Sequence, residues 1–278
     1  MNYVELNIPV SGEEIAEILT AELADWPFDR FAAEQSVLKA YIPQAALADC
    51  KEEVDALLDR YGVERRYVQI EQQNWNALWE SNFEEVEIGG RAVIRAPFHA
   101  PHPEYGDLDI VIMPKMSFGT GHHATTRLMS ETVLNADVAG KRVLDMGSGT
   151  GVLAIIAAKR GAASVDAVDI DDTACESCRE NIATNGVADR IAVIEGDIRS
   201  VASRRYDLIL ANINRNILLR DMPAYAASLE AGGHLAMSGF LEQDIPSITD
   251  RAASLGLIGV ATRTCDGWVA AEFERPLR

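Results

Sequence analysis

The sequence predicts an α/β fold in which a doubly wound, seven-stranded sheet follows a small N-terminal α+β domain. From Lys141 onward, apolar strand-like segments alternate with helical ones, which is typical of a parallel sheet covered by helices. Residues 1–70 show instead the order β-α-β-β-α-β, which is typical of a ferredoxin-like fold. At 278 residues the chain is long enough for one large and one small domain.

A glycine-rich turn joins the first strand of the predicted sheet to the next helix. Residues 145–151 read D-x-G-x-G-x-G, and glycine at alternate positions lets a ligand approach the backbone closely. The helix that follows presents free N–H groups over the turn. The next strand ends at Asp169, at the spacing where an acidic side chain accepts hydrogen bonds from ribose hydroxyls. The pattern predicts a nucleoside cofactor; the simpler alternative is a purely structural turn.

The spacing of the glycines disfavours a nicotinamide dinucleotide. A dinucleotide fingerprint reads G-x-G-x-x-G, with its third glycine one residue later, where this chain has Val152. The predicted strands are Val143–Met146, Ser164–Asp169, Ile191–Glu195, Leu208–Ala211, Leu235–Ser238, Leu257–Ala261 and Val269–Phe273. Only a short polar turn, residues 265–267, joins the last two, so the sheet is expected to end in a hairpin.

The first 70 residues carry no group of side chains at catalytic spacing. We expect helices at Ile15–Leu23, with Ser11 as N-cap, and at about 44–61. This region holds 14 acidic and six basic residues, so we expect it to dock a partner; a regulatory or structural appendage is the alternative.

Residues 71–100 are expected to connect this domain, 1–70, to a catalytic domain, 101–278. Trp75 and Trp79 lie four residues apart, on one face of a predicted helix, and packing is their expected role. Gly89-Gly90 between two apolar segments predicts a hairpin.

A second glycine-containing loop precedes the glycine turn. It follows a predicted strand at Leu108–Met113 and leads into a predicted helix at Arg127–Leu134. Its two glycines and three threonines suit a loop that covers a ligand with backbone and hydroxyl groups. His122 and His123 are adjacent and are expected to pack the loop rather than bind a metal.

Composition limits the classes of partner and location. The net charge of −18 disfavours direct nucleic-acid binding and is compatible with a basic protein partner. We find no leader pattern and no apolar run near ~18 residues, so we expect no membrane span and a cytoplasmic protein. The four cysteines lack the spacing of a zinc site and are expected to be reduced thiols.

Together these motifs resemble one family. The segments Phe118–His122, Thr125-Thr126 and Leu144–Gly151, with Asp169–Asp171 and Leu210–Ile213, are similar to the PrmA family, methyltransferases of the large-subunit ribosomal protein L11. The resemblance covers most of the chain. It implies a class I methyltransferase sheet, S-adenosyl-L-methionine as cofactor, and a ferredoxin-like domain that recognises a basic ribosomal protein of the stalk base.

Five residues are expected to bind the cofactor. Four of them, Thr126, Gly147, Asp169 and Asn212, follow from the resemblance, and Gly149 of the same glycine turn is the fifth expected residue. Gly147 would allow close approach near the methionine part, and the Asp169 carboxylate would accept bonds from the ribose. Thr126 would bind the amino-acid end from the covering loop, and Asn212 would face the crevice at its strand's carboxyl end.

Some positions keep a second interpretation or depart from the family. Asn212 could instead cap the following helix, and Asp197 could meet the adenine amino group or cap a turn. His123-Ala124 stand where the family usually has a proline nearby, and Asn214 stands where it has an apolar residue. These departures concern the fine substrate geometry.

The predicted activity is methyl transfer to lysine side-chain amines, with an N-terminal α-amine as a further candidate acceptor. No residue in the motifs is identified as a general base, and no metal site is expected. A methyltransferase acting on another protein, RNA or a small molecule is the nearest alternative. The net charge disfavours RNA, and an Asn-Pro-Pro-aromatic motif for base or glutamine methylation is absent. Two further alternative functions are a nicotinamide oxidoreductase and a non-enzymatic ribosome-assembly factor.

Overall fold

The computed structural model describes residues 3–34, 36–70, 83–115 and 118–277. Contacts divide the chain into two compact units, Met1–Asn82 (unit 1) and Phe83–Arg278 (unit 2). The predicted helix with Trp75 and Trp79 lies outside the described residues. Residues 83–100 belong to unit 2, and the assignment of functions to domains stays a prediction.

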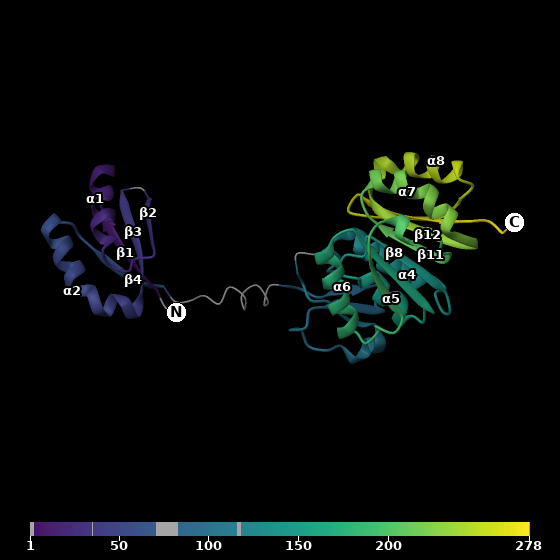
Figure 1. Ribbon diagram of the computed structural model, residues 1–278, viewed down its shortest axis with the longest axis horizontal. Helices are drawn as coiled ribbons and strands as arrows, with labels where there is room; N and C mark the ends of the chain where they lie inside the picture. Colours follow the sequence, from purple (N-terminus) through teal and green to yellow (C-terminus); the bar gives the residue numbers. More distant parts are fainter. Residues whose placement is uncertain (1–2, 35, 71–82, 116–117, 278) are drawn as a thin grey trace. The chain divides into compact units, whose positions relative to one another are not determined.

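Unit 1 is a four-stranded antiparallel sheet with two helices. Its elements in order are β1 (Tyr3–Pro9), α1 (Glu13–Leu23), β2 (Arg30–Glu34), β3 (Val37–Pro43), α2 (Gln44–Tyr61) and β4 (Arg66–Ile70). The sheet order β2-β3-β1-β4, with every neighbouring pair antiparallel, is the predicted ferredoxin-like arrangement (Figure 1). Alternate residues of β1 and β3 pack with both helices in one apolar core.

The N-cap predicted for the first helix is wrong by one residue. Gly12 occupies the cap position and offers no side-chain hydrogen bond, so the Ser11 hydroxyl does not serve as the cap. Glu13 and Glu14 lie in the first turn, where carboxylates interact favourably with the positive end of the helix dipole.

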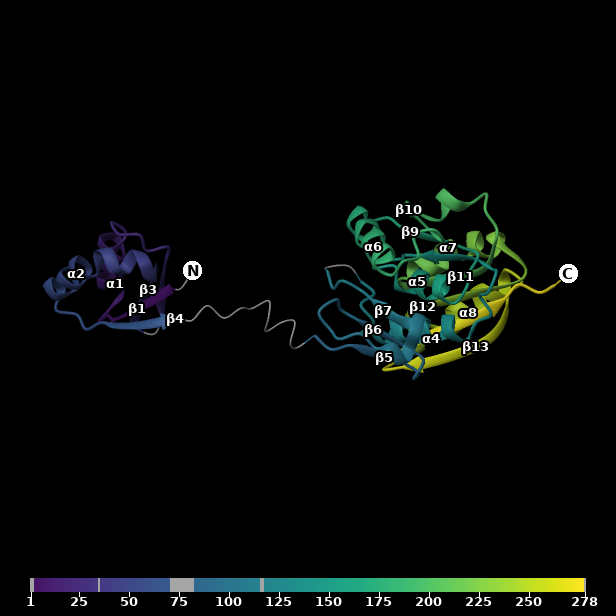
Figure 2. The same cartoon turned by 90° about the horizontal axis from the view of Figure 1, so that it is seen from below.

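Unit 2 begins with a small sheet beside the large one. Its strands are β5 (Val86–Ile88), β6 (Ala92–Arg95) and β7 (Asp109–Val111), in the order β5-β6-β7 (Figure 2). Gly89 and Gly90, both at positive φ, form the predicted hairpin turn. The predicted strand Leu108–Met113 is shorter than expected: its first residue belongs to the 3₁₀ helix η1 (Pro103–Leu108), and β7 ends at Val111, two residues early.

The large sheet has the predicted seven strands. They are β8 (Arg142–Met146), β9 (Ser164–Asp169), β10 (Ile191–Glu195), β11 (Tyr206–Asn212), β12 (Leu229–Leu241), β13 (Ile258–Cys265) and β14 (Trp268–Glu274). Their order is β10-β9-β8-β11-β12-β14-β13, and β14 alone among them runs antiparallel to both neighbours. The β13–β14 turn has Asp266 and Gly267 at positive φ, as a two-residue type I′ hairpin requires.

Helices cover both faces of this sheet. They are α4 (Ala124–Asn135), α5 (Val152–Lys159), α6 (Asp172–Thr184), α7 (Arg215–Ser228) and α8 (Ile245–Ser254), with η2 (Ile198–Val201) and η3 (Glu242–Asp244). Helices α4, α5 and α6 share one apolar core, and α7 and α8 share the other (Figure 1). Adjacent strand residues divide between the cores, Val143 in the first and Leu144 in the second, as the pleat of a strand requires.

The strand order reverses between β8 and β11, which are neighbours in the centre of the sheet. In doubly wound sheets, ligands bind outside the carboxyl ends of the strands at such a reversal. The fold therefore directs attention to the loops after Met146, Asp169 and Asn212.

Candidate functional site

The glycine turn between β8 and α5 is closed on two sides by other loops. Gly147 and Gly149 have φ of 75° and 52°, which side chains rarely adopt. A Cβ on Gly147 would lie 2.2 Å from Ile213 Cγ2, and one on Gly149 would lie 2.3 Å from the carbonyl oxygen of Phe118. Both glycines are therefore required by backbone conformation and by space.

The loop before α4, Phe118–His123, which the sequence predicted as a cover, lies on the glycine turn; we call it the covering loop. Thr150 N donates a hydrogen bond to Phe118 O at 3.0 Å, and Thr150 Oγ1 donates to Gly119 O at 2.7 Å. Because α4 starts at Ala124, Thr126 lies in the first turn of that helix and is 1% exposed. Among the described residues its hydroxyl has no hydrogen-bond partner. A buried hydroxyl without a partner is costly, so this atom suits a ligand contact.

Asp169 ends β9, next to the end of β8, and is half-buried. Its Oδ2 accepts a hydrogen bond from Gly149 N at 2.9 Å, and its Oδ1 accepts one from Asp171 N at 3.1 Å. A carboxylate has about four acceptor positions, so it keeps capacity for two hydroxyl donors. Asp171 itself caps α6 by accepting from Thr173 N and Ala174 N.

Asp145, the first residue of the turn motif, is buried beneath it. Its Oδ2 accepts from Ala154 N at 3.1 Å and so ties β8 to the first turn of α5. Burial, with a smaller contribution from the charge of Asp169, raises the pKa of Asp145 to about 7.

The raised pKa makes stability depend on pH. The folded state binds the Asp145 proton more tightly than the unfolded state, so the free energy of unfolding falls as pH rises from about 4 to about 7. Replacing Asp145 with asparagine keeps an oxygen for Ala154 N and removes the charge. We expect Asp145→Asn to be more stable than the parent at pH 8 by a few kcal/mol and about equal near pH 4. Urea unfolding at both values measures this; a parent advantage at pH 8 would contradict it.

Asn212 lies at the carboxyl end of β11 and lines a cavity of 270 Å³. The alternative interpretation of Asn212 as a helix cap is wrong: Asn214 caps α7, its Oδ1 accepting from Ile217 N at 3.1 Å. The family departure at Asn214 therefore has a structural role. Asp197 caps η2, its carboxylate accepting from the backbone and guanidinium of Arg199, which lowers the pKa of Asp197. Its turn-capping interpretation is confirmed.

Aromatic side chains form one wall of the cavity. The His123 ring lies 4.8 Å from that of Trp268 and 5.2 Å from that of Phe118, centroid to centroid. Sequence reasoning missed Trp268 because it lies in the last strand, far from every motif. Since β14 is antiparallel to β12, its first residue, Trp268, pairs with Leu241 at the carboxyl end of β12. The antiparallel hairpin was the one signal that could have found it.

The histidines of the covering loop pack it, as predicted. His123 caps α4, its Nδ1 accepting from Thr125 N, and His122 contacts the segment before β5. Within residues 3–34, 36–70, 83–115 and 118–277, no three His, Cys, Asp or Glu side chains are arranged to hold a metal ion. All four cysteines are free thiols, as expected.

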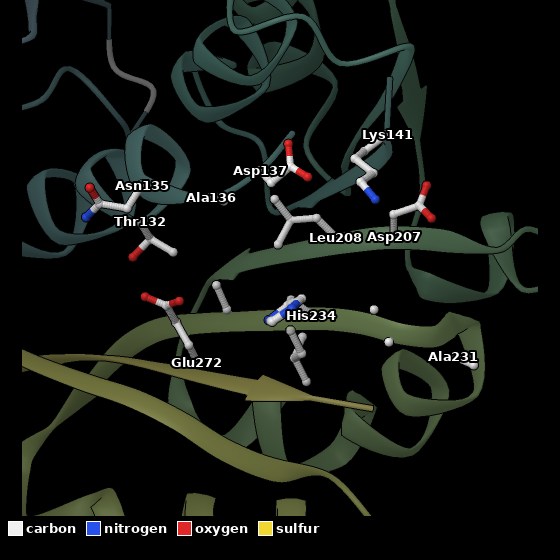
Figure 3. A pocket seen from close by; sticks show the side chains of 14 residues that line it. Thr132, Asn135, Ala136, Asp137, Lys141, Asp207, Leu208, Ala231, His234 and Glu272 are labelled. Atoms are coloured by element: carbon white, nitrogen blue, oxygen red, sulfur yellow. The ribbon is translucent and has the colours of Figure 1, made fainter. Parts of the chain in front are cut away.

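A separate cavity of 380 Å³ lies at the opposite edge of the sheet (Figure 3). Its lining includes Lys141, Asp207 and His234. Lys141 precedes β8, and the other two lie where the regular pairing of β11 with its neighbours begins. None of the predicted site residues lines it, so it is distinct from the site described above.

In the parts of the chain that the structure describes, the helices are too short or too polar to span a membrane.

Comparison with known proteins agrees with this geometry. The family model described as ribosomal protein L11 methyltransferase (PrmA) matches residues 13–276. The ribosomal protein L11 methyltransferase of Porphyromonas gingivalis is 44% identical over 268 residues, covering 94% of this chain and 91% of that protein. Its counterpart in Phocaeicola vulgatus is 40% identical over 280 residues, covering 98% and 99%.

A solved structure supports the same assignment. The crystal structure of ribosomal protein L11 methylase from Lactobacillus delbrueckii subsp. bulgaricus superposes with a TM-score of 0.65 at 29% identity, covering 70% of this chain and all of that one. The predicted class I methyltransferase fold is thereby confirmed. The match to a methyltransferase family supports S-adenosyl-L-methionine as the cofactor. The chain belongs to the family of ribosomal protein L11 methyltransferases.

Proposed function

We propose that this chain transfers methyl groups from S-adenosyl-L-methionine to lysine side-chain amines of ribosomal protein L11, with the N-terminal α-amine as a further acceptor. The observation that carries the proposal is the meeting, at one edge of the sheet, of a glycine turn, a carboxylate and an aromatic cavity. The choice of ribosomal protein L11 as substrate comes from the family, because the relatives are named as methyltransferases of that protein. The stalk base of the large subunit and the cytoplasm are the proposed place of action.

The residues present fit the cofactor. The Asp169 carboxylate has acceptor capacity for a ribose diol, and the buried Thr126 hydroxyl lacks a partner among the described residues. Ile170, next to Asp169, is 74% exposed, and an apolar side chain without burial suits the face of an adenine ring. Gly147 and Gly149 keep the backbone accessible where any side chain would collide. These residues, with Asn212, are the proposed cofactor-binding set.

The cavity beside Asn212 is the proposed acceptor site. A lysine amine has a pKa near ~10.4 in water and is mostly protonated at neutral pH. The rings of Phe118, His123 and Trp268 reduce its contact with water, which favours the neutral amine. The Asn212 side-chain oxygen can accept an N–H bond and orient the nitrogen lone pair.

S-adenosyl-L-methionine supplies a methyl group already activated by a positively charged sulfur. The amine lone pair forms the new N–C bond as the S–C bond breaks, and the sulfur keeps that bond's electron pair. The alkylated nitrogen then releases its proton to water. The protein contributes chiefly alignment and proximity, which are worth several orders of magnitude in rate. The structure assigns no side chain as proton acceptor.

The acidic surface of unit 1 supports a basic protein partner. Residues 1–70 carry 14 acidic and six basic side chains. Opposite charge raises association rates more than it raises affinity. We therefore expect the rate of complex formation to fall steeply with added salt.

The direct test is transfer of labelled methyl groups. Enzyme, labelled S-adenosyl-L-methionine and free ribosomal protein L11 are expected to give label on lysines of that protein, located by mass spectrometry. Ribosomal RNA offered in the same reaction is expected to stay unlabelled. Label on RNA alone, or no label on protein, would reject the substrate assignment.

The aromatic wall gives a second expected result. Trp268→Leu removes the ring while keeping an apolar side chain. We expect kcat/KM for the protein substrate to fall roughly tenfold, because the amine loses aromatic and desolvating contact. The affinity for S-adenosylhomocysteine, measured by calorimetry, is the internal control and should stay within about twofold. Equal loss of both would place Trp268 at the cofactor instead.

A further inference from the structure

Three histidines hold three consecutive residues at the start of unit 2. Residues 83–85 directly follow the last residue of unit 1 in sequence. The contacts are His99 Nε2 to Phe83 O (2.6 Å), His122 Nε2 to Glu84 O (2.9 Å) and His102 Nε2 to Glu85 Oε2 (2.9 Å). We call residues 83–85 the anchored segment. Three of the five histidines of the chain serve it.

His122 differs from the other two because it belongs to the covering loop. A carbonyl oxygen only accepts, so His122 Nε2 must carry the hydrogen that points to Glu84 O. In the neutral ring Nδ1 is then an acceptor, and it lies 3.2 Å from Thr120 Oγ1, which donates to it. The ring thus joins the anchored segment to the loop by two hydrogen bonds. The His122 ring also packs edge-to-face with the Phe83 ring, and the two centroids are 4.6 Å apart.

The same loop is bonded to the glycine turn on its other side. Phe118 O and Gly119 O accept from the backbone and hydroxyl of Thr150, and a Cβ on Gly149 would meet Phe118 O. A continuous path of contacts therefore runs from Glu84 through His122 and the loop to the glycine turn. His122 and Glu84 are 38 residues apart in sequence, so no local sequence pattern predicts their contact.

We propose that His122 is a positioning residue that couples the anchored segment to the covering loop over the cofactor site. The loop keeps its place on the glycine turn through residues 83–85, the point at which the chain passes from unit 1 to unit 2. Displacement of residues 83–85 would therefore move the covering loop and change the affinity for the cofactor. This inference rests on the proposed placement of the cofactor at the glycine turn.

A double-substitution cycle with His99 and His122 tests the coupling in the full chain. His99 holds the anchored segment, and its ring is hydrogen-bonded to Phe83 O and Ala96 N, neither of them in the loop. We expect His99→Ala and His122→Ala each to weaken S-adenosylhomocysteine binding about fivefold, the value of one net hydrogen bond. The double variant should bind about as weakly as His122→Ala alone. His234→Ala, at the opposite edge of the sheet, should change nothing. Additive losses, or no loss, would overturn the coupling.

A gentler pair of variants guards against misfolding. Thr120→Val keeps the shape and removes the hydroxyl that donates to His122, whereas Thr120→Ser keeps the hydroxyl. We expect weaker cofactor binding for Thr120→Val and restored binding for Thr120→Ser, with equal thermal midpoints. Equal binding by both would overturn the proposal. Asp169→Ala, measured alongside, separates the two claims: if it binds normally, the cofactor placement itself is wrong.

Discussion

Asp169→Ala is expected to weaken binding of S-adenosylhomocysteine by about a hundredfold or more. Two hydrogen bonds from ribose hydroxyls to a carboxylate are each worth about 1.5–3 kcal/mol. The substitution also removes the acceptor of Gly149 N and so loosens the turn on which the cofactor lies. Isothermal titration calorimetry at fixed salt measures the change directly.

Asp172→Ala is the matched control for this result. Asp172 is exposed and lies three residues away, and its carboxylate accepts hydrogen bonds only from the backbone and hydroxyl of the adjacent Thr173 among the described residues. Its substitution by alanine removes the same charge. We expect its cofactor affinity to stay within about twofold of the parent. Similar losses in both variants would point to general electrostatics rather than to a ribose contact. Normal binding by Asp169→Ala would remove that residue from the site.

Gly149→Ala is expected to have the second large effect. The new Cβ would lie 2.3 Å from Phe118 O at a φ of +52°, so either the turn or the covering loop must move. We expect the affinity for cofactor to fall at least tenfold and the thermal midpoint to drop by several degrees, since overpacking of this kind costs about 1–3 kcal/mol.

Gly186→Ala separates strain from collision. Gly186 has a φ of +69°, and nothing lies within 4 Å of its added Cβ. This variant should lose about 1 kcal/mol of stability through the left-handed backbone alone and bind cofactor normally. The excess loss in Gly149→Ala then measures the contact with the loop. If the two variants behave alike, the covering loop does not rest on the glycine turn in solution.

Much of the fold follows from local sequence. The alternation of apolar strands and helices after Lys141 predicts the doubly wound sheet, and the short turn at Asp266-Gly267 predicts its final hairpin. The length of β12 does not follow, because its first half contains Gly232-Gly233, which are poor strand formers. Leu229 pairs with β11, but the two glycines are held instead by backbone hydrogen bonds with Arg275, a tertiary contact that no local window contains.

Some residues of the candidate site can likewise be predicted from local sequence, and others cannot. Gly147, Gly149 and Asp169 follow from the motif and the strand ends, because parallel strands bring their carboxyl ends to one edge. Trp268 and the His122–Glu84 contact do not, because each depends on how distant segments meet. The sequence left helix capping open as an alternative role of Asn212, because it does not show that β11 continues through residue 212 and that Asn214 is the cap.

The most direct test of the central claim is a crystal structure of the full chain with S-adenosylhomocysteine. We predict the nucleoside over the turn at Gly147 and Gly149, its ribose hydroxyls bonded to Asp169 and its sulfur facing the cavity beside Asn212. Ordered nucleoside in the cavity of Figure 3, or anywhere other than the carboxyl ends of β8 and β9, would contradict the account.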